Sequence, residues 1–159
     1  SMLTQRIQTL MKDGLSHPKS REIAVLEMEK EFDEELLEMV KEIYMQEGWW
    51  AYLGDDEKLA RAFRNSLYTL GAFEGDRLIG FVRCVGDGEH ILLVQDLIVD
   101  KKHRRQGLGT ALFKMAWERY ADVRMFQVVT DLYDEADNAF YQSFGMKKLV
   151  EGDMVSYFR

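Results

Sequence analysis

Residues 99–110 read Val99-Asp100-Lys101-Lys102-His103-Arg104-Arg105-Gln106-Gly107-Leu108-Gly109-Thr110, and this stretch decides the fold of the chain. An apolar run ends at Val99 and a helical pattern follows over 107–120, so we expect a strand, a basic turn and a helix in succession. The N-terminus of a helix offers unpaired N–H groups and the positive end of the helix dipole, which together bind phosphate. Gly107 and Gly109 let the backbone approach such a ligand without an intervening Cβ. These residues predict a phosphate-bearing ligand, with a solvated basic loop as the alternative.

The known nucleotide motifs do not fit this stretch. The sequence GxxxxGK[ST] is absent, so the turn is not a Walker loop. The dinucleotide fingerprint requires a small residue where this chain has Leu112, and it requires an early βαβ unit that the pattern lacks. The expected ligand is therefore a phosphate-bearing molecule of another kind.

On both sides of this turn, the apolar pattern of the sequence indicates helices that alternate with short strands. Asp33 is a candidate cap for a helix with an apolar stripe through Tyr44, and Gly48 is its expected end. The order predicts an α+β fold, with a mixed, mostly antiparallel central sheet flanked by helices. The expected strands are 23–28, 67–73, 77–85, 90–99, 125–130 and 155–158. The further expected helices are 56–65 and 136–144, and an appended helix with a linker is expected over 2–20.

Composition narrows the class of protein. Apolar residues make up 47% of the chain, and the net charge of −7 argues against nucleic-acid and anionic-membrane partners, because phosphate contacts require basic surfaces. A single cysteine, Cys84, excludes a disulfide framework and a cysteine-rich zinc site. The three histidines lack ligand spacing, so no metal is expected. Because neither a membrane span nor a signal peptide is recognisable, we expect a cytoplasmic protein.

Two stretches carry a family resemblance. Arg104–Gly109 matches the Q/R-x-x-G-x-G/A signature of the GNAT superfamily, the acyl-CoA-dependent N-acyltransferases. The stretch 138–146, Asn-Ala-Phe-Tyr-Gln-Ser-Phe-Gly-Met, is similar to the family's second signature, although Met146 stands where Phe is usual and Asp134 where many members have Asn. The resemblance covers roughly residues 21–159 and implies one acetyltransferase domain there, preceded by a helical extension over 1–20.

The resemblance implies acetyl-CoA as the cofactor and a set of residues that bind it. The backbone of the turn is expected to hold the pyrophosphate, and the strand before it is expected to pair with the pantetheine arm near a bulge. A free N–H at that bulge is expected to stabilise an oxyanion. The implied cofactor-binding residues are Leu97, Ile98, Val99, Arg104, Arg105, Gln106, Gly107, Leu108, Gly109, Thr110, Asn138 and Tyr141.

Tyr141 matches the family tyrosine that lies near the cofactor sulfur. A thiol titrates near pH 8.5 and a phenol near pH 10, so proton transfer from Tyr141 to a thiolate is uphill by about 2 kcal/mol. Either the site lowers the pKa of Tyr141, or Tyr141 mainly donates a hydrogen bond. Asp96 interrupts an apolar strand and is the candidate base that deprotonates the amine; facing a solvated groove is its other interpretation.

The acceptor side is expected at aromatic residues. Trp49, Trp50 and Tyr52 follow the helix that ends at Gly48, and Tyr133 follows the fifth strand. Their rings can hold a cation or an apolar tail; packing or a contact in a homodimer is the alternative. The predicted function is transfer of acetyl from acetyl-CoA to a primary amine of a small molecule, by direct attack in a ternary complex. A peptide or protein N-acetyltransferase and a non-catalytic acyl-CoA-binding module remain alternatives.

Overall fold

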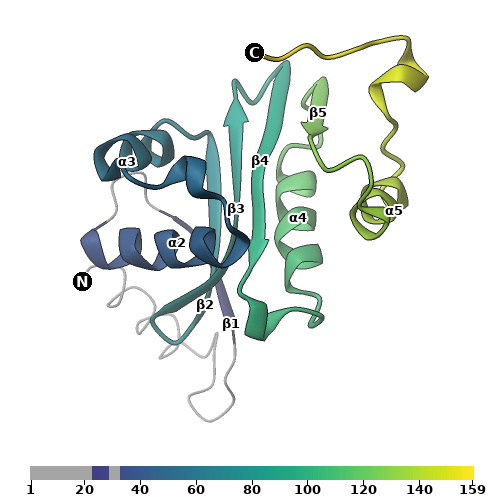
Figure 1. Cartoon of the computed structure of the whole chain (residues 1–159). Helices are drawn as coiled ribbons and strands as arrows, with labels where there is room; N and C mark the ends of the chain where they lie inside the picture. The colour runs from purple at the N-terminus through teal and green to yellow at the C-terminus, as the bar shows by residue number, and fades with distance from the viewer. Residues whose placement is uncertain (1–22, 29–32) are drawn as a thin grey trace. The chain divides into compact units, whose positions relative to one another are not determined.

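The computed structural model describes residues 23–28 and 33–159, so the predicted extension over 1–20 lies outside the described residues. The chain divides into two units, one ending at Gln127 and one running from Val128 to Arg159. The single domain predicted over 21–159 stays a prediction. The elements, in chain order (Figure 1), are β1 (Ile23–Glu27), α2 (Glu34–Glu47), α3 (Asp56–Arg64), β2 (Tyr68–Glu74), β3 (Arg77–Gly86), β4 (Ile91–Val99), α4 (Leu108–Arg119), β5 (Met125–Val128) and α5 (Glu135–Ser143).

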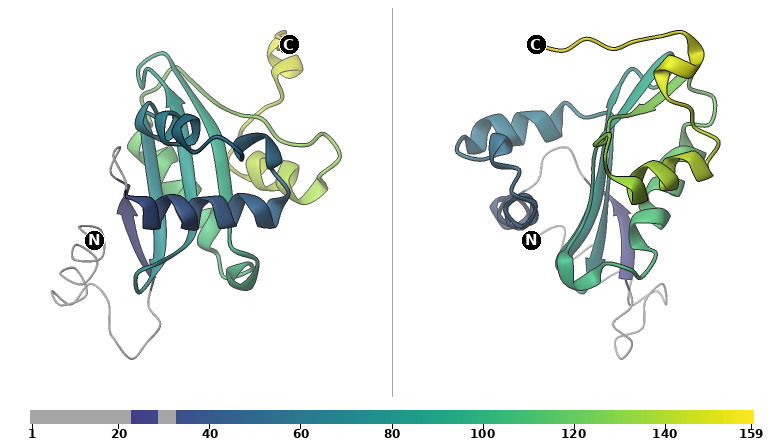
Figure 2. Two further views of the ribbon diagram at one scale, coloured as in Figure 1. Left: turned by 60° about the vertical axis from the view of Figure 1, so that its left-hand side comes forward. Right: turned by 45° about the vertical axis from the view of Figure 1, so that its right-hand side comes forward.

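The strands form one five-stranded sheet in the order β1-β2-β3-β4-β5. The pairs β1/β2, β2/β3 and β3/β4 are antiparallel, which confirms the predicted fold class. Helices α2 and α3 cover one face of the sheet and α4 covers the other (Figure 2). The sheet is therefore the middle layer, and the turn after β4 leads from it to the start of α4.

The main apolar core lies between the sheet and the helices α2 and α3. Tyr44 on α2, Phe63 on α3 and Phe81 on β3 are almost fully buried there. The predicted stripe of α2 is confirmed, because Leu36, Val40, Ile43 and Tyr44 are its buried residues. Its ends are confirmed too: Asp33 accepts a hydrogen bond from the Leu36 N–H at 3.0 Å, and Gly48 takes a left-handed φ of 70°.

A β-bulge interrupts the pairing of β3 with β4. Arg83 pairs with Asp96 while Cys84 pairs with Val94, so Gln95 has no partner residue across the ladder. An extra residue of this kind bends its strand and raises the local twist. This confirms the bulge that was expected in the strand before the turn. The bulge lies directly before Asp96 and the stretch 97–99.

The strand predicted over 155–158 is wrong. A 3-10 turn spans Leu149–Gly152, and the residues after it join no described strand. Val155, Tyr157 and Phe158 expose 70%, 90% and 98% of their surface. Strand preference reflects fit against a neighbouring strand, so a β-branched and aromatic composition alone does not create one.

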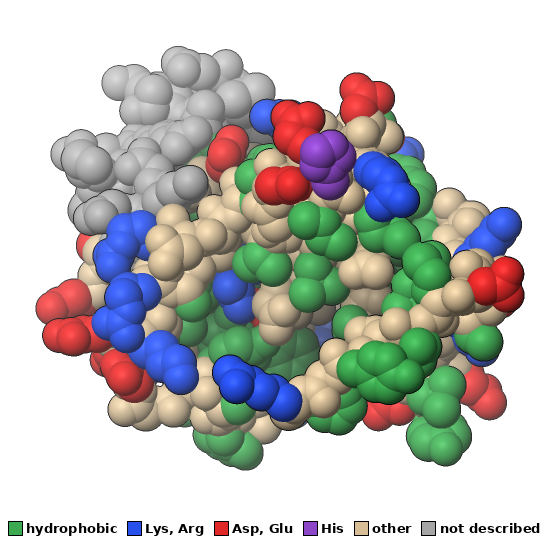
Figure 3. All heavy atoms as spheres, turned by 90° about the horizontal axis from the view of Figure 1, so that it is seen from above, with side chains coloured by type: hydrophobic (Ala, Val, Ile, Leu, Met, Phe, Trp, Pro, Cys, Tyr) green, Lys and Arg blue, Asp and Glu red, His purple; other side chains and the backbone are tan. Residues whose placement is uncertain are grey.

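On the face drawn in Figure 3, several Lys and Arg side chains lie in a row along one edge, with Asp and Glu side chains beside them. Among residues 23–28 and 33–159, no helix combines the length and the apolar character needed to cross a bilayer.

The turn between β3 and β4 is closed by one carboxylate. Asp87 Oδ1 accepts hydrogen bonds from the N–H groups of Glu89, His90 and Ile91 at 2.9, 2.8 and 3.0 Å. These bonds lower the pKa of Asp87 to about 2. Since the ionised form is favoured in the folded chain, the stabilisation is complete above pH 4 and is lost as the pH falls toward 2.

We therefore expect Asp87→Ala to lower the free energy of unfolding at pH 6, and the difference from wild type to shrink as the pH approaches 2. Urea denaturation of both chains between pH 6 and pH 2 measures this. A stability difference that stays constant across that range would contradict the assignment.

Candidate functional site

The turn after β4 has the predicted order of strand, turn and helix. β4 ends at Val99, a 3-10 turn spans Lys101–His103, and α4 begins at Leu108. Two residues of the turn have left-handed backbones: Gly107 with φ 77°, and Arg105 with φ 64°. Gly107 adopts this conformation freely, whereas Arg105 carries a Cβ that disfavours it.

The first N–H groups of α4 have no partner within the helix. Its first helical hydrogen bond runs from the Ala111 N–H to the Gly107 carbonyl at 3.0 Å, so the N–H groups of 108–110 precede it. No acidic side chain lies in this first turn and no side chain caps it. In contrast, α2, α3 and α5 each have an Asp cap and acidic first turns. The positive end of α4 is therefore available to an anionic ligand.

Packing within the protein does not explain why residue 109 is a glycine. A Cβ built at Gly109 would lie 3.7 Å from Val99 Cγ2, an ordinary contact, and the backbone there is not left-handed. Alanine is also the better helix former by about 1 kcal/mol. The chain itself therefore tolerates a side chain here, and a glycine is needed only if something outside the chain comes close.

The two arginines of the turn differ. Arg104 Nε donates to the Val99 carbonyl at 3.1 Å, and its guanidinium forms an ion pair with Glu47 at the end of α2. Arg105 and Gln106 are exposed. The side chain of Arg104 thus fastens the turn to the protein, while Arg105 and Gln106 face solvent.

Asp96 lies in a buried polar cluster and exposes 1% of its surface. Its Oδ2 accepts hydrogen bonds from Arg83 Nε at 2.7 Å and from the Tyr44 hydroxyl at 2.6 Å. Burial and the charge of Asp96 raise the pKa of Tyr44, so this hydroxyl keeps its proton. The interpretation of Asp96 as a residue facing a solvated groove is wrong, because only 1% of its surface is exposed. Its role as the base stays a prediction.

The acceptor-side aromatic residues lie beside this cluster. Tyr52 stacks on Tyr44 with ring centroids 4.5 Å apart, and its hydroxyl accepts a hydrogen bond from Gln95 Nε2 at 2.8 Å. The Trp49 ring centroid lies 6.2 Å from that of Tyr52. Trp50 exposes 64% of its surface. The structure therefore brings Trp49 and Tyr52 close to the bulge, and it leaves the Trp50 side chain largely in solvent.

In the second unit, Tyr141 lies on α5. Burial, followed by the charges of Asp137 and Asp134, raises its pKa to about 12. The Asn138 side-chain amide donates hydrogen bonds to the carbonyls of Asp131 and Asp134 at 2.9 and 2.7 Å, and these bonds stabilise the loop before α5. Asp134, where many family members have Asn, caps α5 through the Asp137 N–H at 2.9 Å. Tyr133 exposes 86% of its surface.

Sequence reasoning missed Arg83 and Tyr44 as partners of Asp96. A signal was present, since Arg83 is a cation flanked by apolar residues inside one strand and Asp96 is the single anion of the next. Their pairing also depends on the position of the bulge at Gln95, and the family resemblance implied a bulge without giving its residue. Across residues 23–28 and 33–159, no group of three or more His, Cys, Asp or Glu side chains is arranged to hold a metal ion.

Comparison with known proteins shows the family to which the chain belongs. The sequence model of the acetyltransferase (GNAT) family matches residues 25–146. The chain belongs to the GNAT acetyltransferase family. A GNAT family acetyltransferase protein from Streptococcus pneumoniae is 31% identical, with a TM-score of 0.71 over 87% of this chain and 97% of the other. No curated protein matches the sequence.

Two aminoglycoside acetyltransferases from uncultured soil metagenomic samples share the GNAT fold. One is 18% identical, with a TM-score of 0.65 over 87% of this chain and 97% of the other. The second, in complex with sisomicin, is 17% identical, with a TM-score of 0.66 over 86% of this chain and 94% of the other. GNAT proteins generally use acetyl-CoA, a phosphate-bearing acyl donor, and the start of α4 provides N–H groups suited to such a ligand.

The Asp96 cluster can be tested by comparing a single variant with a double variant. Asp96→Asn leaves the Arg83 cation buried without its counter-charge, and we expect it to lower the free energy of unfolding by about 3–5 kcal/mol. Arg83→Met combined with Asp96→Leu removes both charges, and we expect it to recover most of this loss. Urea denaturation measures both. A double variant no more stable than Asp96→Asn would contradict the pairing.

Proposed function

We propose that this GNAT protein is an N-acetyltransferase that moves acetyl from acetyl-CoA to a primary amine of a small molecule, by direct attack in a ternary complex. The observation that carries the proposal is the start of α4. The first N–H groups of α4 have no hydrogen-bond partner within the helix, and its first turn contains no acidic residue that would compensate the helix dipole. Packing within the chain does not require the glycine at position 109, so the space beside it is open to a ligand.

The residues of the first unit fit acetyl-CoA. The N–H groups of 107–110 would hold its pyrophosphate, and the exposed Arg105 would add a positive charge. Leu97–Val99, beyond the bulge, would supply backbone groups to its pantetheine arm.

The thioester of acetyl-CoA supplies an activated acetyl group. The acceptor amine attacks that group directly, without an acyl-enzyme, since no described cysteine or serine lies in an activating setting; Cys84 is fully buried.

Tyr141 acts as a hydrogen-bond donor. With its pKa raised to about 12, complete transfer of its proton to a thiolate is uphill by roughly 5 kcal/mol. A raised pKa argues against the alternative in which the site lowers it, and it favours the protonated hydroxyl near neutral pH. Tyr141 therefore stabilises negative charge that develops on sulfur by donating a hydrogen bond.

The acceptor is a cationic amine that must lose a proton before it attacks. The aromatic rings of Trp49 and Trp50 suit a cation, and the net charge of −7 favours its approach. Asp96 is the candidate base, acting directly or through water.

The double variant Arg83→Met with Asp96→Leu separates a structural role of Asp96 from a catalytic one. If both stability and turnover recover, Asp96 has a structural role alone. If stability recovers and turnover is lost, the result supports Asp96 as the base.

A thiol-release assay with an amine panel tests the proposed function. The panel contains small amines, polyamines, aminoglycosides, amino acids and peptides with free N-termini. We expect turnover with at least one small amine. Binding of acetyl-CoA without turnover across the panel would instead support a non-catalytic module, and turnover with peptides alone would support a peptide N-acetyltransferase.

Gly109→Asp tests the placement of acetyl-CoA. The added Cβ meets only an ordinary contact in the protein, and an acidic side chain in the first turn suits the helix dipole, so we expect the free energy of unfolding to change by less than about 1 kcal/mol. The same side chain places a negative charge next to the bound pyrophosphate, so we expect the Kd for acetyl-CoA to rise at least tenfold, measured by calorimetry. Glu118→Ala, on an exposed part of the same helix, is the control. Unchanged affinity in Gly109→Asp would overturn the placement.

Tyr141→Phe tests the hydrogen-bond donor. We expect kcat to fall at least tenfold while the Kd for acetyl-CoA changes less than twofold. Because the pKa of Tyr141 is about 12, the donor stays protonated below pH 10, so the ratio of wild-type to variant kcat should stay constant between pH 7 and pH 10. Tyr157→Phe, at an exposed tyrosine, is the matched control. A ratio that shrinks as the pH rises would show that Tyr141 loses its proton in this range.

A further inference from the structure

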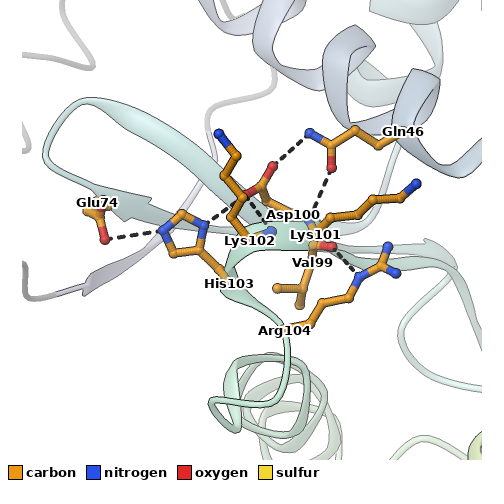
Figure 4. Close-up of polar contacts among 8 residues, drawn as sticks. All are labelled: Gln46, Glu74, Val99, Asp100, Lys101, Lys102, His103 and Arg104. Atoms are coloured by element: carbon orange, nitrogen blue, oxygen red, sulfur yellow. Dashed lines mark hydrogen bonds and ion pairs between the residues drawn. The ribbon is translucent and has the colours of Figure 1, made fainter.

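Asp100, the residue that follows β4, is a buried carboxylate that no part of the proposed chemistry uses. It exposes 3% of its surface. Its oxygens accept hydrogen bonds from Gln46 Nε2 at 2.7 Å and from the Lys102 N–H at 3.2 Å, and they lie 2.8 Å from His103 Nδ1 (Figure 4). Burial disfavours its charge, but these three partners outweigh burial and lower the pKa of Asp100.

Gln46 holds the turn from the side of α2. While its amide nitrogen donates to Asp100, its Oε1 accepts a hydrogen bond from the Lys101 N–H at 3.1 Å. One side chain therefore fixes two consecutive residues of the turn. Its neighbour Glu47 pairs with Arg104, so the last turn of α2 contacts this segment at three points.

His103 holds the turn from the side of the β2–β3 hairpin. Its Nε2 lies 3.2 Å from Glu74 Oε2 at the end of β2, and its Nδ1 faces Asp100 (Figure 4). The ring therefore links the turn to a strand that is not its neighbour in the sheet. Gln46, Glu74, Asp100 and His103 together are named the Asp100 clamp.

We propose that the Asp100 clamp positions the acetyl-CoA-binding turn, with Gln46 and His103 as positioning residues. The proposal rests on the proposed function of that turn. The clamp fixes 100–103, and the chain then passes through the left-handed Arg105 to the N–H groups at the start of α4. A disfavoured backbone such as that of Arg105 persists only when its surroundings determine it. A turn ordered before the ligand arrives loses less entropy on binding.

The decisive variant is Gln46→Glu. It preserves the shape and the acceptor for the Lys101 N–H, but it replaces the donor to Asp100 with a second carboxylate. We expect the Kd and the KM for acetyl-CoA to rise at least tenfold, while kcat at saturating acetyl-CoA stays within twofold. His103→Ala should raise both constants as well, and His103→Gln should recover part of the affinity, since its amide can still donate to Asp100.

Asp87→Ala is the matched control. Asp87 is also a carboxylate that closes a turn through backbone N–H groups, but its turn precedes β4 whereas the clamp follows it. We expect this control to lose stability and to keep the wild-type Kd for acetyl-CoA. An affinity loss in Gln46→Glu and His103→Ala no larger than in Asp87→Ala would overturn the proposal.

Hydrogen exchange of the unliganded chain separates this proposal from the proposed function. We expect the amides of 101–107 to exchange faster in Gln46→Glu than in wild type, and at the wild-type rate in Asp87→Ala. Wild-type protein that binds no acetyl-CoA would overturn the proposed function. Wild-type protein that binds it, with clamp variants unchanged in affinity or in exchange, would overturn the clamp alone.

Discussion

The ion pair between Arg83 and Asp96 is the constraint on which the arrangement of the first unit depends. Both side chains are almost fully buried, and a buried charge without its partner is strongly destabilising. The two strands must therefore meet with Arg83 opposite Asp96, which places the extra residue of the bulge at Gln95. Every later residue of β4, and the turn that follows it, takes its position from this register.

Helix α2 links that constraint to the turn. Tyr44 donates to Asp96 in the core, and one half-turn later Gln46 and Glu47 contact Asp100 and Arg104. The same helix ends at Gly48 and leads directly into Trp49 and Tyr52, beside the bulge. One helix is thus the common reference for the turn after β4 and for the aromatic residues near the bulge, so a shift of α2 would move both.

The sequence predicted what local patterns encode, and it missed what the tertiary structure decides. The apolar stripe of α2, its Asp33 cap and the glycine-rich start of α4 each depend on residues close together in the chain. The bond between Gln46 and Asp100 joins residues 54 positions apart, and no periodicity signals it. The strand expected over 155–158 failed for the same reason, since a strand exists only beside a partner.

The sequence predicted two titratable catalytic residues, Tyr141 and Asp96, and the surroundings of each one limit proton transfer. Tyr141 holds its proton up to a pKa of about 12, which suits a donor and not a base. Asp96 already receives two hydrogen bonds on one oxygen, one of them from a cation. An enzyme with these groups would gain most of its rate by holding donor and acceptor in place, because orientation needs no shifted proton. The accuracy with which the turn after β4 is fixed would then decide how tightly acetyl-CoA is held, and the proposed role of Asp100 and its partners is to fix that turn.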